Sequence, residues 1–336
     1  MLSEDRIRPA CARCIGAILA LALLVLPTIA AANIEQQREL FKSVYKTVDR
    51  GDWSPVDGLS ASERALLERY VLWPDLRATW LRANLKSAPA AEIDAFMQQY
   101  GTLRPARELR YKQAMMLARD GDLAGFRNIY EQFYQGQDIA RLDCLALQAE
   151  IDAGRHARVN QRAIDLWLVG TSQVSECDPV FAYLKRNQLL GPVEYRKRFA
   201  LAIEAREFRL ARWLAKKIDQ AHIDEATLWI QAQSDPEGFL RRHNPTIDSP
   251  TYRQQLAYAA ERLTYRDPEV ALRLWGAVEQ RYGFPEETTL RTRRHIALWT
   301  ARDNLPGGYA QLAALPPAAQ DEEVLRWRAR SSLRDT

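Results

Sequence analysis

The sequence predicts an all-α protein, built as an irregular α-solenoid of helix hairpins with tetratricopeptide-like packing. Four observations lead to this fold class. Strong helix formers dominate the composition, and alternating runs of β-branched residues are nearly absent. Capping residues followed by proline mark helix starts, and a helix-ending mark recurs along the chain. We therefore expect a stack of helix pairs and no β-sheet.

The first 32 residues form the first element. Three arginines precede an apolar run from Ile15 to Leu26, and the small residues Ala30 to Ala32 follow. This order is typical of a secretory signal peptide, with cleavage after Ala32. The alternative is a membrane anchor, but the run is shorter than the ~20 apolar residues that a spanning helix needs. We expect a periplasmic protein that is not attached to the membrane after the signal is removed.

The charge of the exported part is nearly balanced. Without residues 1–32 the chain has 44 Lys and Arg against 41 Asp and Glu, with the two signs interspersed. Proteins that bind nucleic acid normally cluster basic residues on one face. The sequence therefore predicts no nucleic-acid partner, and runs such as Lys216-Lys217 are interpreted as solvated helix faces.

Helix starts are marked by Asp or Ser directly before proline, because the side chain can accept bonds from free backbone N–H groups and proline has none to leave unpaired. The four cases are Asp178-Pro179, Asp235-Pro236, Ser249-Pro250 and Asp267-Pro268. Ser60 and Glu63 have the spacing of a capping box. Glu286-Glu287 and Asp321-Glu322-Glu323 are interpreted as acidic first turns that oppose the helix dipole.

Apolar stripes and turn marks define the helix pairs. Each stripe repeats at three and four positions, as in Leu210, Trp213, Leu214 and Ile218. A helix end followed by an acidic residue recurs at Asp120, Glu207, Asp267 and Asp303. Each short helix must bury its stripe against neighbours, which is the packing of a solenoid. We expect loops at 170–177 and 304–317, and one domain over residues 33–336.

Two of the four cysteines, Cys11 and Cys14, fall in the signal segment, which leaves Cys144 and Cys177. Two cysteines in an exported chain most simply form a disulfide. The alternatives are a metal pair and a catalytic thiol, but no histidine stands at ligand spacing from another candidate. The sequence predicts no metal site and no cofactor.

No catalytic residue is predicted. The sequence has no nucleotide-binding glycine loop and no zinc-protease, serine-hydrolase or Ser/Lys motif. The nine tryptophans invite a carbohydrate-binding interpretation, because indole rings stack on sugars. Most of them lie on apolar stripes, however, and core packing is the default interpretation for each.

Several stretches resemble the amino-terminal superhelical, U-shaped region of soluble lytic murein transglycosylases, periplasmic enzymes that cut peptidoglycan glycan strands. The segments are Trp73-Pro74 with Ile93, Phe96 and Tyr100; Leu142-Asp-Cys144 with Trp167, Gly170 and Ser172; Cys177-Asp178-Pro179; and Asp267-Pro268 with Ala271 and Trp275. The resemblance implies a U- or ring-shaped superhelix and a disulfide between Cys144 and Cys177.

The family's catalytic glutamate stands in an E-S motif followed by G-L-M-Q, in a lysozyme-like domain. Neither motif occurs in this sequence. The resemblance thus implies a non-catalytic scaffold that binds peptidoglycan glycan strands, with a separate lysozyme-like domain as a further candidate partner. The family itself cleaves the MurNAc-GlcNAc β-1,4 bond and leaves a 1,6-anhydro product; this chain is predicted to be inactive alone.

Two other functions remain open. The chain could be a tetratricopeptide-like adaptor that binds envelope proteins, or an independent glycoside-cleaving enzyme with an unrecognised site. A last expectation concerns the carboxyl end. Leu325 and Trp327 share one side of the final helix, and Leu333-Arg334-Asp335 repeats the turn mark before the sequence stops. This pattern predicts a chain truncated within a hairpin, with a loosely held last helix.

Overall fold

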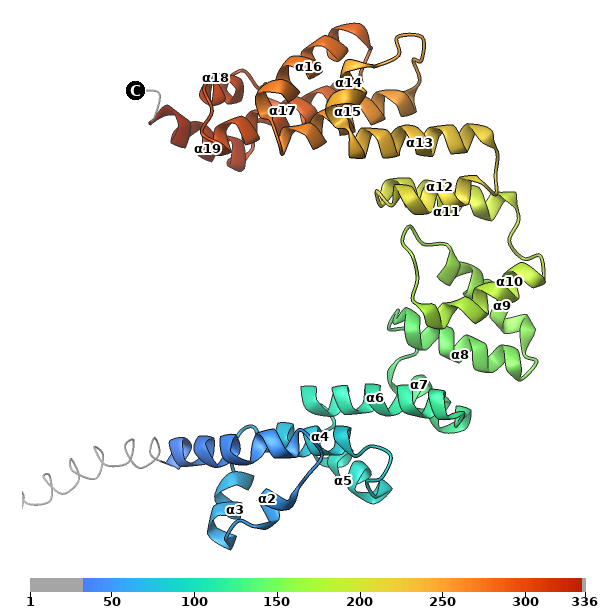
Figure 1. Cartoon of the computed structure of the whole chain (residues 1–336), viewed down its shortest axis with the longest axis vertical. Coiled ribbons are helices and arrows are strands. Elements are labelled where there is room, and N and C mark those ends of the chain that lie inside the picture. The colour runs from blue at the N-terminus through green and yellow to red at the C-terminus, as the bar shows by residue number, and fades with distance from the viewer. Residues whose placement is uncertain (1–32, 334–336) are drawn as a thin grey trace, which may run out of the picture. The chain divides into compact units, whose positions relative to one another are not determined.

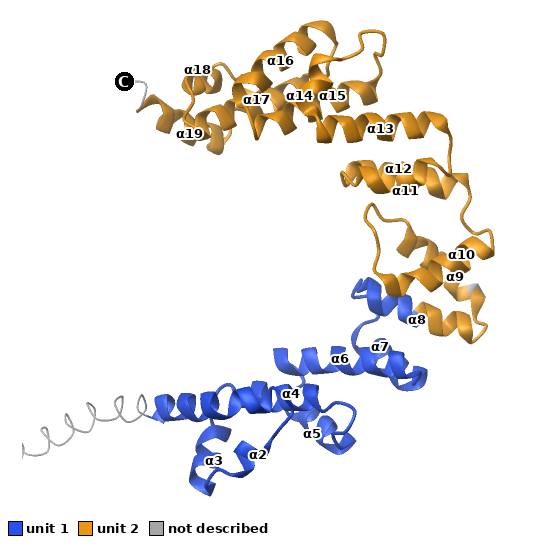
Figure 2. Ribbon diagram, viewed as in Figure 1, with its two compact units in different colours: residues 1–146 blue, residues 147–336 orange. Residues whose placement is uncertain are grey.

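The computed structural model describes residues 33–333, and over that range it contains helices and no strand (Figure 1). The predicted all-α fold class is confirmed. The chain divides into two compact units, residues 1–146 and 147–336, with the boundary inside helix α8 (Figure 2). The predicted signal peptide lies outside the described residues.

Unit 1 begins with a helix at residues 33–48 and continues as short helices that pair with their neighbours in sequence. They are α2 (Ser54–Asp57), α3 (Ala61–Glu68), α4 (Trp73–Ala83), α5 (Ala90–Tyr100), α6 (Arg104–Asp120), α7 (Leu123–Phe133) and the first half of α8 (Ala140–Asp152).

Unit 2 continues the same construction. Its elements are α9 (His156–Trp167), η1 (Ser175–Cys177), α10 (Asp178–Arg186), α11 (Pro192–Glu204), α12 (Phe208–Ala215), α13 (Gln220–Ser234), α14 (Pro236–Arg241), α15 (Pro250–Thr264), α16 (Pro268–Arg281), α17 (Glu286–Arg302), α18 (Gly308–Ala313), η2 (Pro317–Ala319) and α19 (Glu322–Ser332).

The hydrophobic cores follow one another along the chain. In unit 1, successive clusters centre on Leu76, Leu109 and Phe126; in unit 2, a large cluster centres on Trp275 and a smaller one on Leu312. Each helix packs mainly on helices close to it in sequence, as α15 does on α13, α14, α16 and α17. This nearest-neighbour packing is that of a solenoid.

The helix starts follow the predicted caps, with one exception. Asp235, Ser249 and Asp267 each accept a bond from the backbone N–H three residues on, and Ser60 with Glu63 forms the capping box. The prediction for Asp178 is wrong. The turn η1 runs directly into α10, so Asp178 is the first helical residue and its side chain caps nothing.

Helix ends at the hairpin turns use a left-handed residue. Gln188, Arg206 and Asn304 have φ values of 57°, 60° and 59°, and the next residue in each case bonds back to the carbonyl five positions before it, at 2.9, 2.8 and 3.0 Å. This is the Schellman arrangement, in which glycine is the usual left-handed residue. The turns predicted at Glu207 and Asp303 are therefore present. The left-handed residue is Arg206, directly before Glu207, in the first turn and Asn304, directly after Asp303, in the second.

The segment 304–317 differs from the predicted loop. It contains helix α18, whose first residue, Gly308, packs so closely on α17 that an added Cβ would lie 2.9 Å from the Cα of Ala301. The final helix also differs: Val324 and Trp327 face α17 and α18, whereas Leu325 is 45% exposed. Residues two apart point to different sides of a helix, so Leu325 and Trp327 do not form one stripe.

Cys144 and Cys177 are fully buried and disulfide-bonded. Between residues 33 and 333, no helix has both the length and the apolar composition of a membrane span.

Candidate functional site

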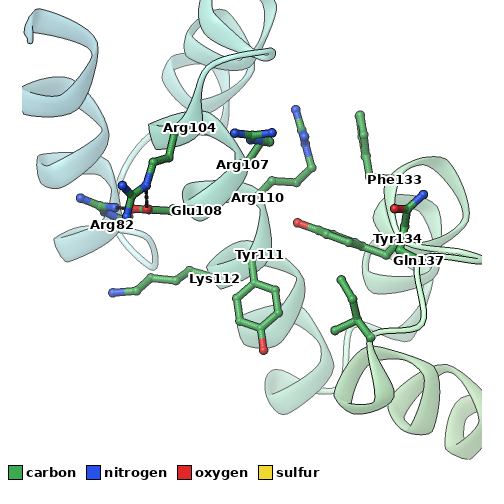
Figure 3. Close-up of a pocket in the computed structure, with 11 residues that line it drawn as sticks. Arg82, Arg104, Arg107, Glu108, Arg110, Tyr111, Lys112, Phe133, Tyr134 and Gln137 are labelled. Atoms are coloured by element: carbon green, nitrogen blue, oxygen red, sulfur yellow. Dashed lines mark hydrogen bonds and ion pairs between the residues drawn. The ribbon is translucent and has the colours of Figure 1, made fainter. Parts of the chain in front are cut away.

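Each unit carries a pocket of its own. The basic pocket of unit 1 has a volume of about 740 Å³ and is lined by α4, α6, α7 and the residues after α7; it includes Arg82, Arg104, Arg107, Glu108, Arg110, Tyr111, Lys112, Phe133 and Tyr134 (Figure 3). The tryptophan pocket of unit 2 has a volume of about 730 Å³ and includes Trp167, Asp178, Phe181, Lys185, Arg198, Glu207, Arg209 and Trp213.

Five cations and one carboxylate line the basic pocket. That carboxylate, Glu108, accepts from Arg82 on α4 and from Arg104 at 2.8 Å, and the bond from Arg104 is the main cause that lowers the pKa of Glu108. Two positive charges thus converge on one negative charge. Arg107 and Lys112 have no carboxylate within ion-pair distance in the described part of the chain, so the pocket keeps a positive surplus.

Aromatic rings form the far wall of the basic pocket. The guanidinium of Arg110 lies 3.8 Å from the ring centre of Phe133 and donates to the Gly101 carbonyl at 3.1 Å, which holds it in place. Tyr111 meets Tyr134 edge to face at 6.4 Å, and burial raises the pKa of Tyr134. Figure 3 shows Arg107 and Arg110 on the side of α6 that faces Phe133.

A buried arginine forms the floor of the tryptophan pocket. Arg198 on α11 is 4% exposed, and its guanidinium stacks on Trp167 at 4.6 Å. It donates to the carbonyls of Val169 and Thr171, both at 3.2 Å. Burial is the main cause that lowers the pKa of Arg198. These two hydrogen bonds from Arg198 therefore hold the start of the predicted 170–177 loop against α11. Gly170 also packs there against the Leu201 carbonyl.

Trp213 on α12 forms the wall of the same pocket and is 42% exposed. The ammonium of Lys185 on α10 lies 5.5 Å from its ring centre. Asp178 and Glu207 supply acceptors, and Arg209 supplies donors, around the indole. A flat aromatic ring bordered by charged hydrogen-bonding groups is suited to an oxygen-rich ligand with apolar C–H faces.

Core packing is the correct interpretation for most of the tryptophans. Trp73, Trp167, Trp229 and Trp275 are at most 9% exposed, and four others are partly buried. Trp213 is the exception. Its stripe neighbour Leu214 is fully buried, but Trp213 itself faces the pocket and solvent. For this residue the default of core packing is wrong.

The near balance of positive and negative charge in the sequence did not indicate the basic pocket. Arg104, Arg107 and Arg110 recur every three residues on α6, a pattern that also describes an ordinary solvated face. Nothing in that pattern indicates that Phe133 and Tyr134 lie opposite. The spacing alone could have placed the three arginines on one side of a helix.

No group of three or more His, Cys, Asp or Glu residues suited to a metal occurs within 33–333. One carboxyl there has a raised pKa: burial of Glu225 on α13 is the main cause. A buried acid of this kind can act as a proton donor. Glu225 lines neither pocket, so the geometry does not place it beside a ligand held in either one.

No family model matches the chain. It is 26% identical over 301 residues to the soluble lytic murein transglycosylase of Salmonella typhimurium, covering 89% of this chain and 45% of the relative. The corresponding protein of Escherichia coli K12 is 24% identical over 283 residues, covering 84% and 43%. The chain thus spans less than half the length of the curated relatives it matches.

Solved structures that match the chain are also lytic transglycosylases. The lytic transglycosylase Slt of Pseudomonas aeruginosa matches with a TM-score of 0.56 at 27% identity, covering 88% of this chain and 47% of that one. The 70-kDa soluble lytic transglycosylase of Escherichia coli matches with a TM-score of 0.53 at 22% identity, which supports the fold alone. The predicted resemblance is confirmed: over 84 to 90% of its length the chain is similar to soluble lytic murein transglycosylases.

Proposed function

We propose that this chain is a non-catalytic helical scaffold of the periplasm that binds the glycan strands of peptidoglycan. The observation that carries the proposal is the tryptophan pocket. Trp213 offers an exposed indole face, and Asp178, Glu207 and Arg209 provide hydrogen-bonding groups around it. Sugars present apolar C–H faces ringed by hydroxyls, and this arrangement complements both parts.

Three further observations support the proposal. Similarity to murein transglycosylases makes peptidoglycan the expected substrate class. The sequence of residues 1–32 predicts export to the compartment where peptidoglycan lies. The sequence has neither the E-S motif nor the G-L-M-Q segment of the family's catalytic domain, which favours binding over cleavage. A separate lysozyme-like domain is the proposed source of catalysis.

The test is cosedimentation of the purified chain with isolated sacculi. We expect binding, and we expect Trp213→Ala to weaken it about two- to thirteenfold, the value of one stacking contact of about 0.5–1.5 kcal/mol. The matched control is Tyr309→Ala, which removes an aromatic side chain of similar exposure, 40%, outside the pocket.

Equal losses for the two variants would show that Trp213 has no specific role. The adaptor function makes the opposite prediction from the scaffold. An adaptor would retain a protein from periplasmic extract and would leave sacculi in the supernatant. That result would replace glycan binding as the function.

A further inference from the structure

The basic pocket of unit 1 has a charge surplus that the fold does not require. Arg82 and Arg104 together bind the single lining carboxylate, Glu108, and so complete one ion-pair cluster. Arg107 and Lys112 are exposed, without an ion-pair partner among residues 33–333. A concave surface with uncompensated charge of one sign concentrates ligands of the opposite sign.

Arg110, another cation of the basic pocket, is held in position by the fold itself. The ring of Phe133 and the carbonyl of Gly101 fix its guanidinium at the pocket wall. A preorganised guanidinium loses less entropy when it binds, and its planar fork matches the two oxygens of a carboxylate. Arg107 and Arg110 lie on the side of α6 that faces Phe133, and Lys112 extends on the side where Arg82 lies (Figure 3).

We propose that the basic pocket binds a short peptide that carries several carboxylates. Arg107 and Arg110 are three positions apart on α6 and lie on the side of the helix that faces Phe133, with a rise of about 4.5 Å between them along the helix axis. An extended peptide covers that distance in roughly one to two residues. Carboxylates on neighbouring or alternate residues of such a peptide match the spacing of the cations. The volume of about 740 Å³ also suits a ligand of this size.

The aromatic residues argue against single-stranded nucleic acid, which also binds basic grooves. Proteins that bind single-stranded nucleic acid stack the bases on open faces of aromatic rings. Here the Arg110 guanidinium covers Phe133, and Tyr111 meets Tyr134 edge to face. Arg110 therefore occupies one face of Phe133, which leaves a base less ring surface for stacking than an open aromatic platform offers.

This inference does not depend on the proposed glycan binding. It concerns the other unit, a different pocket and an ionic ligand. Loss of glycan binding in the Trp213 variant would not contradict peptide binding by the basic pocket. A failure of the basic pocket to bind peptide would not contradict glycan binding by the tryptophan pocket.

The experiment measures binding of two synthetic peptides to the whole chain by isothermal titration calorimetry at low salt. The peptides are N-acetyl-triglutamate and N-acetyl-triglutamine amide, which match in length and differ in charge. We expect triglutamate to bind and the neutral peptide not to bind. We expect Arg107→Gln combined with Lys112→Gln to weaken triglutamate binding about tenfold or more, because both changes remove cations that have no other partner.

The matched control is Lys216→Gln with Lys217→Gln, which removes the same charge from an exposed part of unit 2 outside both pockets. It should bind triglutamate as the unmodified chain does. Unchanged melting of the double variant confirms that it is folded. The inference is overturned if triglutamate does not bind, if both peptides bind equally, if the control pair loses as much, or if an oligonucleotide of equal charge binds more tightly.

Discussion

His295 on α17 couples the stability of unit 2 to pH. It lies between Tyr265 and Trp299, and burial is the main cause that lowers its pKa from the ordinary value of 6.5. Among its charged neighbours, Arg302 and Arg206 lower the pKa further and Glu261 raises it. Its Nε2 atom is buried without a hydrogen-bond partner. Burial in the folded chain therefore favours the neutral form of this ring.

The unfolded chain binds the extra proton at a higher pH than the folded chain does, so folding becomes less favourable as the pH falls below about 6.5. We expect the melting temperature to fall more between about pH 7.5 and pH 5.5 for the unmodified chain than for His295→Gln, which cannot titrate. Thermal melts of both proteins at the two pH values measure this. Parallel falls would show that His295 does not contribute to the pH dependence.

Single residues show how far the sequence could predict function. Trp213 and Leu214 are neighbours on one apolar stripe, yet only Leu214 is buried, because the position of α10 relative to α12 leaves the indole at a pocket. That position depends on tertiary packing, which a stripe does not encode. Arg107 was unpredictable for the same reason: its significance depends on Phe133, which lies 26 positions later in the sequence.

At the scale of elements, α19 is held at its first turn. Asp321 accepts from the Val324 amide at 3.0 Å, the main cause that lowers its pKa. Arg294 bonds both Asp321 and Glu323, and Arg302 bonds Glu323 as well. These contacts join the start of the helix to α17. The expectation of a loosely held end can be tested at this turn.

Asp321→Ala removes the cap and one ion-pair partner together. We expect it to destabilise α19 by about 1 kcal/mol and to speed amide exchange in that helix about fivefold, because a lost cap typically has that effect. Hydrogen exchange with mass spectrometry reports each helix separately. Ser249→Ala, which removes the cap of α15, is the control and should leave exchange in α19 unchanged. If α19 in the unmodified chain already exchanges as fast as an unfolded peptide, the cap does not hold it.

Most helix boundaries could be predicted, because the caps and turns act locally. Asp235, Ser249 and Asp267 cap as expected, since the chain enters each helix from an extended or near-extended residue. Asp178 fails because η1 precedes it without an extended residue. Helix α18 was missed because Gly307-Gly308 and three prolines suggest a loop, whereas Gly308 serves there for close packing on Ala301.

For the molecule as a whole, the disulfide is the first prediction. Cys144 and Cys177 enclose a loop of about 33 residues, and bridging it lowers the entropy of the unfolded chain, which stabilises the fold by roughly 3–4 kcal/mol. We expect Cys144→Ala to lower the melting temperature and to leave the helical circular-dichroism signal unchanged. Mass spectrometry of the mature protein without reductant should find no free thiol; two free thiols would contradict the pairing.

A second prediction is that the pure chain does not cleave peptidoglycan. Its sequence contains neither the E-S motif of the family's catalytic glutamate nor the G-L-M-Q segment. Sacculi incubated with the chain should release no 1,6-anhydro muropeptides, while a complete transglycosylase does so in parallel. Their release would show an active site, and Glu225→Gln would then be the first variant to examine.

The fold of the whole chain was predictable from distributed signals: helix formers, caps, repeated turns and the segments around Cys144 and Asp267 that resemble the family. The division of the chain into two units could not be predicted from the sequence. The boundary at residues 146 and 147 falls inside α8, a continuous helix with no Pro, Gly or polar linker to mark it. The composition does not show the cation surplus of the basic pocket, because acidic residues elsewhere in the chain balance it.

The left-handed residues at the helix ends imply that exposure and mutational tolerance are separate properties in this chain. Asp138, Gln188, Arg206 and Asn304 all have exposed side chains, which usually marks a position as indifferent to substitution. Their backbones, however, occupy a conformation that costs an L-residue roughly 1–2 kcal/mol and that a β-branched side chain rarely adopts. Valine at Gln188 or Asn304 would thus be harmful on the open surface, while glycine would be accepted. A survey of variants would find sensitive sites where the chain reverses, at residues that belong neither to a core nor to the lining of the two pockets.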